Sequence, residues 1–564
     1  MTATSPLSHS TVGSVADASQ LTTFMRFCEA RTGLQFADHA AFHGFSVTEY
    51  RRFWLLFLEW SGLLYEGSPE PVCTDDACER ATFFPGVRLN YVENLLRIDS
   101  PQDGERLALL AHRAGGATER VTRRELRSRV RALAAELHRI GVSPEERVVA
   151  VVPNSPEAVV AALASVAIGA TFSIAAPDMG VPALLSRFDQ LAPVVLMASL
   201  EDHAETGSSA PSDRVRALTD ALPSLKAVIA LDDGAAPRDL AVPLYRLSDV
   251  PASGEDSDGE WPRFPFNHPL FVMFTSGTTG PPKCIVHGAG GTLVEHAKEH
   301  RLHVDLRPHD TLFFHSSTAW MMWNWQLSAL ACGCPIVLFD GSFAEPQTLW
   351  QLVEEDDVSV FGTSPPYLQL CEDSGISPGR ERVLRALRTV LSTGSILHDW
   401  QYDWVRDHVG PVALQSVSGG TDIIGCFVLG NPDLPVRRGM IQCRSLGLDV
   451  RALALSAEAI GELVCCNPFP SRPLGLVGDD GTRFHAAYFE SNPGVWTHGD
   501  LIEFDADGHA RMHGRSDGVL TVQGVRIGPA EIQGALRGVT EVTEGLAVEQ
   551  RTTGMRGASR VRCV

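Results

Sequence analysis

The sequence predicts an α/β protein built on parallel sheets, because helix-like and strand-like segments alternate along it. An amphipathic helix is expected at residues 122–140, where Thr122 and Glu125 form a capping box, apolar residues recur every three or four positions and Gly141 supplies a stop signal. A strand is expected at 147–152, a helix from Ala158 and a second strand at 171–175. This alternation is typical of parallel strands joined by helical crossovers.

Further apolar runs of strand length continue the pattern. They lie at residues 194–198, 227–231, 270–274, 335–339 and 389–391. The longest apolar run, residues 158–176, is long enough to raise the question of a membrane helix. Ser165, Gly169 and Ser173 interrupt it, so we predict a buried helix followed by a buried strand, and no membrane span.

Length and charge exclude several classes of protein. A chain of 564 residues is long enough for two to four domains around a substantial core. Its 47 basic and 68 acidic residues give a net charge of −21, which disfavours nucleic acid and anionic membranes as partners. The twelve cysteines include no CxxC pair, and residues 1–15 lack the basic start and apolar run of a secretory signal. We therefore expect reduced thiols and a cytoplasmic protein; the oligomeric state is left open.

One glycine- and threonine-rich segment suits phosphate binding. Residues 274–283 read Phe-Thr-Ser-Gly-Thr-Thr-Gly-Pro-Pro-Lys, which offers backbone N–H groups and hydroxyl donors directly after a predicted strand. Lys283 is one of only three lysines, with Lys226 and Lys298. Because Pro282 and Cys284 flank Lys283, the segment is not a Walker A loop. A flexible loop with a surface lysine is the alternative interpretation.

This segment resembles the phosphate-binding motif of adenylate-forming enzymes, the superfamily of acyl-CoA synthetases, peptide-synthetase adenylation domains and luciferases. Further stretches follow in the order found in acetoacetyl-CoA synthetases. They are residues 84–94, 153–158, 283–291, 319–325, 361–364, 391–395, 416–422, 496–500 and 514–517. The resemblance implies an enzyme that joins a short oxo-acid, acetoacetate first, to AMP with loss of pyrophosphate and then transfers the acyl group to coenzyme A. ATP, Mg²⁺ and coenzyme A are the implied cofactor and co-substrates.

The resemblance also implies the domain organisation. We expect a helical lead-in at residues 1–100, a large adenylating body of several subdomains at 101–514, and a hinge with part of a small, mobile α+β C-terminal domain at 515–564. Only 47 residues follow Asp517, the expected hinge, so we expect this last domain to be truncated. The lysine that the family uses there during adenylation has no counterpart after Lys298. The chain is then either a fragment of a complete synthetase or a short form that performs one half-reaction or only binds ATP or the acyl-adenylate, with or without a partner.

Roles for single residues follow from the same resemblance. The β- and γ-phosphates would be held by Thr275, Ser276, Gly277, Thr278, Thr279, Gly280 and Lys283. Adenine would lie against Gly394, Ser395 and Ile396 and beside the strand edge of Ser418, Gly419 and Gly420. Thr421 would contact the α-phosphate, and Asp422 would be the magnesium ligand, so that these two and Lys283 are the catalytic candidates.

Two more residues are assigned to the ribose. Asp500 would accept both ribose hydroxyls, and Arg515 would reach the ribose and phosphate. The alternatives are a turn residue for Asp500 and a surface ion pair between Arg515 and Asp517.

The substrate pockets are the least defined part of the resemblance. Where two-carbon relatives have a large aromatic residue, this chain has Gly419, so an acid longer than acetate should fit. Trp320 and Met321 would line the floor of the acyl pocket with Gly419 and Gly420, although an aromatic run is as often core packing. Gly180 and Arg187 are the candidates for contact with coenzyme A.

Two other classes of function remain open at this point. One is a non-catalytic protein that binds a nucleotide or acyl-adenylate and acts through a partner. The other is an adenylation domain that loads a carrier protein, which residues 418–422 disfavour because they resemble the acetoacetyl-type signature.

Overall fold

The computed structural model describes residues 18–113, 115–201, 210–251, 259–275, 282–341, 345–454 and 459–516, together with the backbone of four strands beyond them. Those four strands form two antiparallel hairpins, β26 (Leu520–Val522) with β27 (Val525–Ile527) and β28 (Ala547–Arg551) with β29 (Ser559–Cys563). The predicted domain limits at residues 100 and 514 stay predictions.

The first large sheet has eight strands in the order β23-β12-β11-β6-β5-β7-β8-β9. Six of them run parallel: β5 (Arg147–Val151), β6 (Thr171–Ala175), β7 (Val195–Ala198), β8 (Ala227–Ala230), β9 (Leu244–Arg246) and β11 (Pro269–Thr275). The edge strands β12 (Lys283–Gly288) and β23 (Gly475–Leu476) are antiparallel to their neighbours. The predicted strands at 147–152, 171–175, 194–198, 227–231 and 270–274 are thus confirmed.

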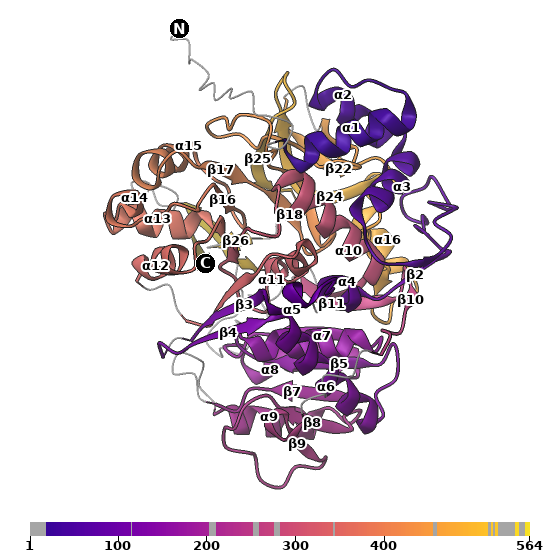
Figure 1. Cartoon of the computed structure of the whole chain (residues 1–564), viewed down its shortest axis with the longest axis vertical. Coiled ribbons are helices and arrows are strands. Elements are labelled where there is room, and N and C mark those ends of the chain that lie inside the picture. The colour runs from indigo at the N-terminus through magenta and orange to yellow at the C-terminus, as the bar shows by residue number, and fades with distance from the viewer. Residues whose placement is uncertain are drawn as a thin grey trace.

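Helices cover both faces of this sheet (Figure 1). Val148 and Ala150 share one hydrophobic core with α6 (Arg123–Ile140) and α7 (Pro156–Ala167). Val149 and Val151 belong to another core with α8 (Val181–Phe188) and α9 (Pro211–Ala221). Successive residues of a strand point to opposite faces, so a strand covered on both sides is apolar throughout.

The two best-predicted helices are confirmed in detail. The capping box of α6 is complete, since the Glu125 N–H donates to Thr122 Oγ1 at 3.2 Å and the Thr122 N–H donates to Glu125 Oε2 at 2.8 Å. The long apolar run splits into α7 and β6, and Gly169 turns the chain between them with a φ of 82°. Within the described residues, no helix combines the length and apolarity that crossing a bilayer requires.

The second large sheet has seven strands in the order β17-β16-β15-β13-β14-β3-β4. They are β3 (Leu107–His112), β4 (Thr118–Thr122), β13 (Leu312–Phe314), β14 (Ile336–Phe339), β15 (Val360–Thr363), β16 (Thr389–Ser392) and β17 (Ala413–Ser416). All neighbours are parallel except β3 and β4, so the strands predicted at 335–339 and 389–391 are confirmed. The associated helices are α11 (Met321–Ser328), α12 (Gln347–Glu355), α13 (Pro365–Asp373), α14 (Pro378–Glu381) and α15 (Asp399–Trp404).

Smaller sheets complete the body. One consists of β18 (Ser418–Gly420), β19 (Gly425–Leu429) and β20 (Cys443–Arg444), and another of β21 (Val450–Ala454), β22 (Gly461–Cys465), β24 (Trp496–Phe504) and β25 (Ala510–Arg515). Beside them lie α16 (Thr482–Tyr488) and α10 (Ala289–Lys298), which continues into a π-helical turn, η4 (Glu299–His303).

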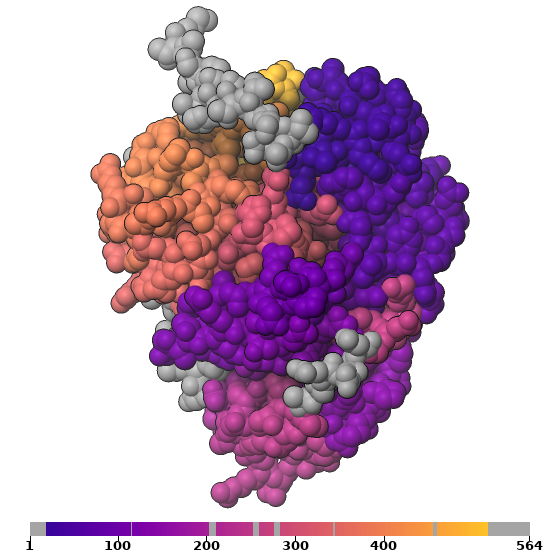
Figure 2. Space-filling model, in the orientation of Figure 1, coloured from indigo at the N-terminus to yellow at the C-terminus, as the bar shows by residue number. Residues whose placement is uncertain are grey.

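The N-terminal helices α1 (Gln20–Thr32), α2 (His39–Thr48) and α3 (Tyr50–Ser61) pack at one end of the molecule, in indigo in Figures 1 and 2. They lead into α4 (Tyr91–Leu95), α5 (Pro101–Glu105) and a small sheet of β1 (Glu66–Gly67), β2 (Val87–Leu89) and β10 (Phe264–Pro265). The described residues of this part are predominantly helical, and their buried aromatic side chains share a core with α10.

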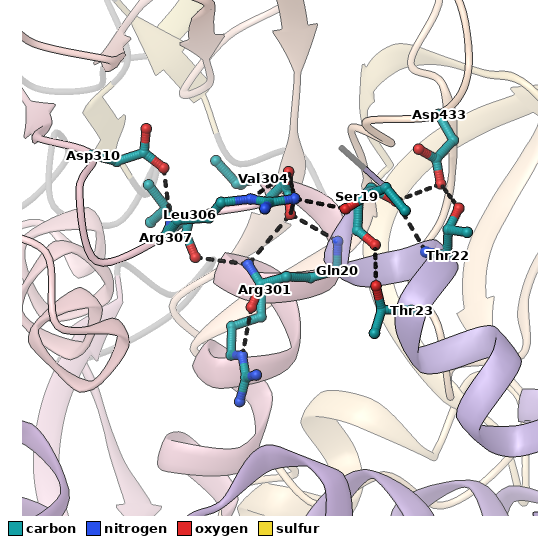
Figure 3. Close-up of polar contacts among 12 residues, drawn as sticks. Ser19, Gln20, Thr22, Thr23, Arg301, Val304, Leu306, Arg307, Asp310 and Asp433 are labelled. Atoms are coloured by element: carbon teal, nitrogen blue, oxygen red, sulfur yellow. Dashed lines mark hydrogen bonds and ion pairs between the residues drawn. The ribbon is translucent and has the colours of Figure 1, made fainter. Parts of the chain in front are cut away.

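Polar contacts at the start of α1 fix these helices to the body (Figure 3). Ser19 Oγ and Thr22 Oγ1 both donate to Asp433 Oδ2, at 2.7 and 2.8 Å. The Gln20 N–H donates to Asp305 Oδ1 at 2.8 Å. The contacts join segments that are about 300 to 400 residues apart in the sequence.

The described cysteines are free thiols, and nine of them are buried.

Two helical glycines provide a test of the packing. A Cβ at Gly291 in α10 would lie 2.2 Å from the carbonyl oxygen of Pro470, whereas a Cβ at Gly44 in α2 would meet nothing within 4 Å. We expect Gly291→Ala to destabilise the protein by about 1–3 kcal/mol through overpacking. Gly44→Ala should be neutral or stabilise by up to about 1 kcal/mol, because alanine favours helix. Thermal unfolding of the two variants checks this; equal midpoints would contradict the close approach of α10 to residue 470.

Candidate active site

Most predicted site residues lie just beyond the carboxyl ends of parallel strands. Thr275 ends β11, Gly394 follows β16, Ser418 follows β17, and Trp320 follows β13. Ser392 of β16 pairs with Ser416 of β17, so the segments after these two strands start from the same level of the sheet. Ligands of open α/β sheets bind in the crevice at such strand ends.

The predicted phosphate loop joins β11 to β12. Thr275 and Lys283 are directly opposed across this antiparallel pair, so the loop starts and ends at one place. Among the described residues Thr275 Oγ1 is buried and has no hydrogen-bond partner. The loop residues Ser276, Gly277, Thr278, Thr279 and Gly280 lie outside the described residues.

Lys283 and Asp422, two of the three catalytic candidates, are in contact. Lys283 Nζ lies 3.3 Å from Asp422 Oδ1, and the Asp422 side chain is only 6% exposed. The Tyr488 hydroxyl donates to the same oxygen at 2.6 Å. Lys283 Nζ also lies 3.3 Å from this hydroxyl and 4.7 Å from the centre of the Tyr488 ring. The three side chains form what we call the Asp422 cluster: Lys283, Asp422 and Tyr488.

Histidine 287 lies behind this cluster on β12. Its imidazole is buried against the backbone of Thr421 and near Asp422, and burial lowers its pKa to about 4. His287 is therefore neutral near pH 7.

Aromatic packing connects the Asp422 cluster to β24. The rings of Tyr488 and Trp496 are stacked with centres 4.0 Å apart, and Trp496 is the first residue of β24. The same strand carries His498, whose ring lies 4.8 Å from that of Phe427 on β19. A Cβ at Gly420 would lie 2.9 Å from His498 Cε1, so this position requires the small residue that the sequence has.

Asp500 and Arg515 form an ion pair across β24 and β25. Arg515 Nη1 lies 3.0 Å from Asp500 Oδ1, and the two side chains are 12% and 8% exposed. His498 Nε2 lies 3.4 Å from Asp500 Oδ2. Asp500 is thus a buried strand residue and not a turn residue. Asp517 lies outside the described residues, so its pairing with Arg515 stays an alternative.

Glu462 supports this pair from the neighbouring strand β22. Its Oε1 accepts the Gly499 N–H at 2.8 Å. Burial raises the pKa of Glu462, with a smaller contribution from Asp500.

The structure gives Gly419 a role that the sequence did not indicate. A Cβ at this position would lie 1.9 Å from the Gly425 carbonyl oxygen, so it would point into β19 and not into open space. Glycine is needed here for the close approach of β18 and β19. Met321 is buried at the start of α11 and Trp320 is half-buried before it. The acyl pocket of Trp320, Met321, Gly419 and Gly420 stays a prediction.

The candidates for coenzyme A contact lie on α8. Gly180 is its N-cap residue, and the Arg187 guanidinium lies 5.9 Å from the centre of the Phe274 ring, beside the end of β11. A cavity of about 440 Å³ lies at the carboxyl ends of β5, β7 and β8, lined by Arg113, Arg129, Ser199 and Asp232 among others. Gly180 and Arg187 do not line it.

Sequence reasoning did not single out Tyr488, His287, His498 or Glu462. His287 and His498 lie within the recognised stretches 283–291 and 496–500, so their motifs could have suggested them. Tyr488 lies 66 residues from Asp422 in a segment without a motif, and only the fold brings the two together.

Comparisons with known proteins agree with this arrangement. The model of the family "AMP-binding enzyme" matches residues 99–451. The acetoacetyl-coenzyme A synthetase of Rhizobium meliloti (strain 1021) is 39% identical over 95% of this chain and 83% of that protein. The acetoacetyl-CoA synthetase of Mus musculus is 38% identical over 94% of this chain and 81% of that protein.

A more distant relative and a solved structure extend the comparison. The malonamoyl-CoA synthetase vrtB of Penicillium aethiopicum is 33% identical over 95% of this chain and 78% of that protein. The solved structure of an acetoacetyl-CoA synthetase from Streptomyces lividans superposes with a TM-score of 0.84 at 38% identity, covering 94% of this chain and 83% of that chain. The chain therefore belongs to the AMP-binding enzyme family.

Proposed function

We propose that the chain is an ATP-dependent acid–thiol ligase that converts acetoacetate to an acyl-adenylate and then to the coenzyme A thioester. The Asp422 cluster beside the Asp500–Arg515 pair carries this proposal, because it combines a cation for phosphates with carboxylates for a metal ion and a ribose. Relatives at 37–39% identity that are named acetoacetyl-CoA synthetases support the choice of acid.

Lys283 is the described cation best suited to the triphosphate. Its side chain lies at the end of the predicted phosphate loop and is 28% exposed, so a ligand can reach it. In a chain with a net charge of −21, a local cation and backbone N–H groups have to attract the polyanion. When ATP binds, Lys283 would exchange part of its contact with Asp422 for the β- and γ-phosphates, and Thr421 would contact the α-phosphate.

Asp422 is suited to Mg²⁺, because its carboxylate offers the oxygen ligands that this ion requires. Bound Mg²⁺ supplies positive charge to the phosphates. The Tyr488 hydroxyl and Lys283 hold Asp422 Oδ1, which fixes the direction of the carboxylate.

Asp500 would bind the ribose hydroxyls, and Gly394, Ser395 and Ile396 would contact adenine. Arg515 contacts the Asp500 carboxylate at 3.0 Å and would also bind a phosphate. Gly180 and Arg187 are proposed for coenzyme A on the side of α8. The free thiols of the described cysteines are consistent with a reducing cytoplasmic location.

The proposed reaction is tested by pyrophosphate exchange. The purified chain is incubated with ATP, Mg²⁺, labelled pyrophosphate and one carboxylate from a panel that runs from acetate through acetoacetate to aromatic acids. We expect exchange that depends on the acid and is fastest with acetoacetate, and release of AMP when coenzyme A is added. Absence of exchange with every acid, both in this chain and in one extended to include the C-terminal lysine that the family uses, would refute the adenylation proposal, and ATP binding without exchange would favour a non-catalytic binding protein.

Lys283→Ala should weaken ATP binding about tenfold or more, because a charge-assisted contact to phosphate is lost. Lys226→Ala is the matched control. Lys226 is a surface lysine paired with Glu146 at 2.7 Å in the edge region of the first sheet. Titration calorimetry with ATP measures both variants. Equal ATP affinities of the two variants would show that Lys283 does not contact the phosphates.

Tyr488→Phe should lower the rate of adenylation about tenfold while the protein keeps its stability, because the ring can still stack on Trp496 but the hydrogen bond to a charged carboxylate is lost. Tyr367→Phe serves as the control, since this buried hydroxyl donates at 2.6 Å to the Pro346 carbonyl, away from the site. Steady-state kinetics with acetoacetate compares the two; a loss of the same size in both would argue against a role for Tyr488 in orienting Asp422.

A further inference from the structure

Six ionisable side chains are completely buried on α10 and its π-helical turn. They are Glu295, His296, Lys298, Glu299, His300 and His303, each with 0% of its surface exposed. Burying charged groups is costly unless each finds a partner. Several of these side chains bind residues at or near β19 and β20, next to the active site.

The charged members bind one another and the strands next to the active site. Lys298 Nζ donates to Glu295 Oε1 at 2.7 Å and to Ser445 Oγ at 2.6 Å. Glu299 accepts two hydrogen bonds, from the Cys426 N–H at 2.6 Å and from Trp325 Nε1–H at 2.7 Å. Burial, with a smaller contribution from Glu295, raises the pKa of Glu299.

His296 binds the turn residue Ile424, directly before β19. Its Nε2 lies 2.5 Å from the Ile424 carbonyl oxygen, and because a carbonyl only accepts, Nε2 carries the proton. Burial lowers the pKa of His296 to about 3, so the ring is neutral and Nδ1 accepts from Ser328 Oγ at 2.6 Å. Tyr91 Oη lies 2.5 Å from the same Ser328 oxygen and can donate to it.

These two bonds hold the turn end of the β18–β19 hairpin, where Thr421 and Asp422 lie. Ile424 and Cys426 flank Gly425, which pairs with Gly420 across β18 and β19. Ile424 has a φ of 48°, a left-handed conformation that is unfavourable for a β-branched residue. A Cβ at Gly425 would lie 3.0 Å from Glu299 Oε1, so glycine lets the strand reach the carboxylate.

We propose that His296 and Glu299 are positioning residues for adenylation: from behind the sheet, they fix the 418–429 hairpin so that Thr421 and Asp422 face Lys283. The proposal rests on the proposed function, since it needs Thr421 and Asp422 to act in the first half-reaction. Neither residue touches the substrates; each acts through the backbone of the hairpin.

The chain contains a matched control for a purely structural role. His303 is equally buried on the same segment, and its Nδ1 lies 2.9 Å from the Gly430 carbonyl oxygen. This contact is of the same type as that of His296, but it lies at the far end of β19 from Asp422. If the buried histidines only stabilise the fold, replacing His296 or His303 should have the same effect.

The experiment compares His296→Leu, His296→Gln, Glu299→Gln and His303→Leu in the full chain. Glutamine at 296 keeps an N–H donor that can reach the Ile424 carbonyl. Glutamine at 299 has only one side-chain oxygen, so either the Cys426 N–H or the Trp325 Nε1–H loses its acceptor and faces an amide nitrogen. For each variant we measure kcat and KM for ATP in acetoacetate-dependent pyrophosphate exchange, the unfolding midpoint, and deuterium exchange of peptides covering residues 418–429.

We expect His296→Leu and Glu299→Gln to lower kcat at least tenfold with KM for ATP changed less than threefold, and to speed deuterium exchange in the hairpin. His296→Gln should recover most of kcat, and His303→Leu should keep kcat within threefold at a similar loss in unfolding midpoint. Equal losses of kcat in His296→Leu and His303→Leu, or hairpin exchange unchanged in His296→Leu, would overturn the proposal. A wild-type chain without any pyrophosphate exchange would instead refute the proposed function, and the hairpin exchange data would still decide whether His296 and Glu299 hold the turn.

Discussion

The hydrogen-bonded carboxylate of Asp422 is the contact on which the site depends, because three elements that are distant in the sequence meet there. Lys283 comes from the edge of the first large sheet, Asp422 from the hairpin after the second, and Tyr488 from α16. The stack of Tyr488 on Trp496 then sets the position of β24 and, through it, of Asp500. An error in the docking of any of these elements would separate the proposed phosphate and ribose contacts.

Local signals in the sequence were sufficient for the framework. The capping box of α6, the apolar strands and the break at Gly169 act over a few residues, and the structure confirms each of them. The motifs likewise indicated Lys283, Asp422, Asp500 and Arg515, which the structure brings into two adjacent pairs. The resemblance to a family depended on the order of these motifs along the whole chain. No single segment carries that information.

What the sequence could not supply were contacts made over long separations. Residues 295–303, Glu-His-Ala-Lys-Glu-His-Arg-Leu-His, have the composition of a solvent-exposed helix, yet most of these side chains are buried. Their partners Cys426 and Ser445 lie more than 100 residues away, so only the tertiary fold explains the burial. Gly419 is a different case: its contact with β19 is local, but the sequence suggested this glycine as a gap in a pocket wall, whereas the structure shows that it lies directly against Gly425.

The edge of the first sheet has a consequence for synthesis of the protein on the ribosome. Strand β12 is complete at residue 288, but its outer neighbour β23 begins at residue 475. Because the ribosome adds about 5–20 residues per second, roughly 10–40 seconds pass between the synthesis of β12 and that of β23. During that time an apolar strand has unpaired backbone groups on one side, a condition that favours association with other chains. The short strand β23 is thus the last piece of this sheet to be made, and it gives β12 the outer neighbour that closes this side.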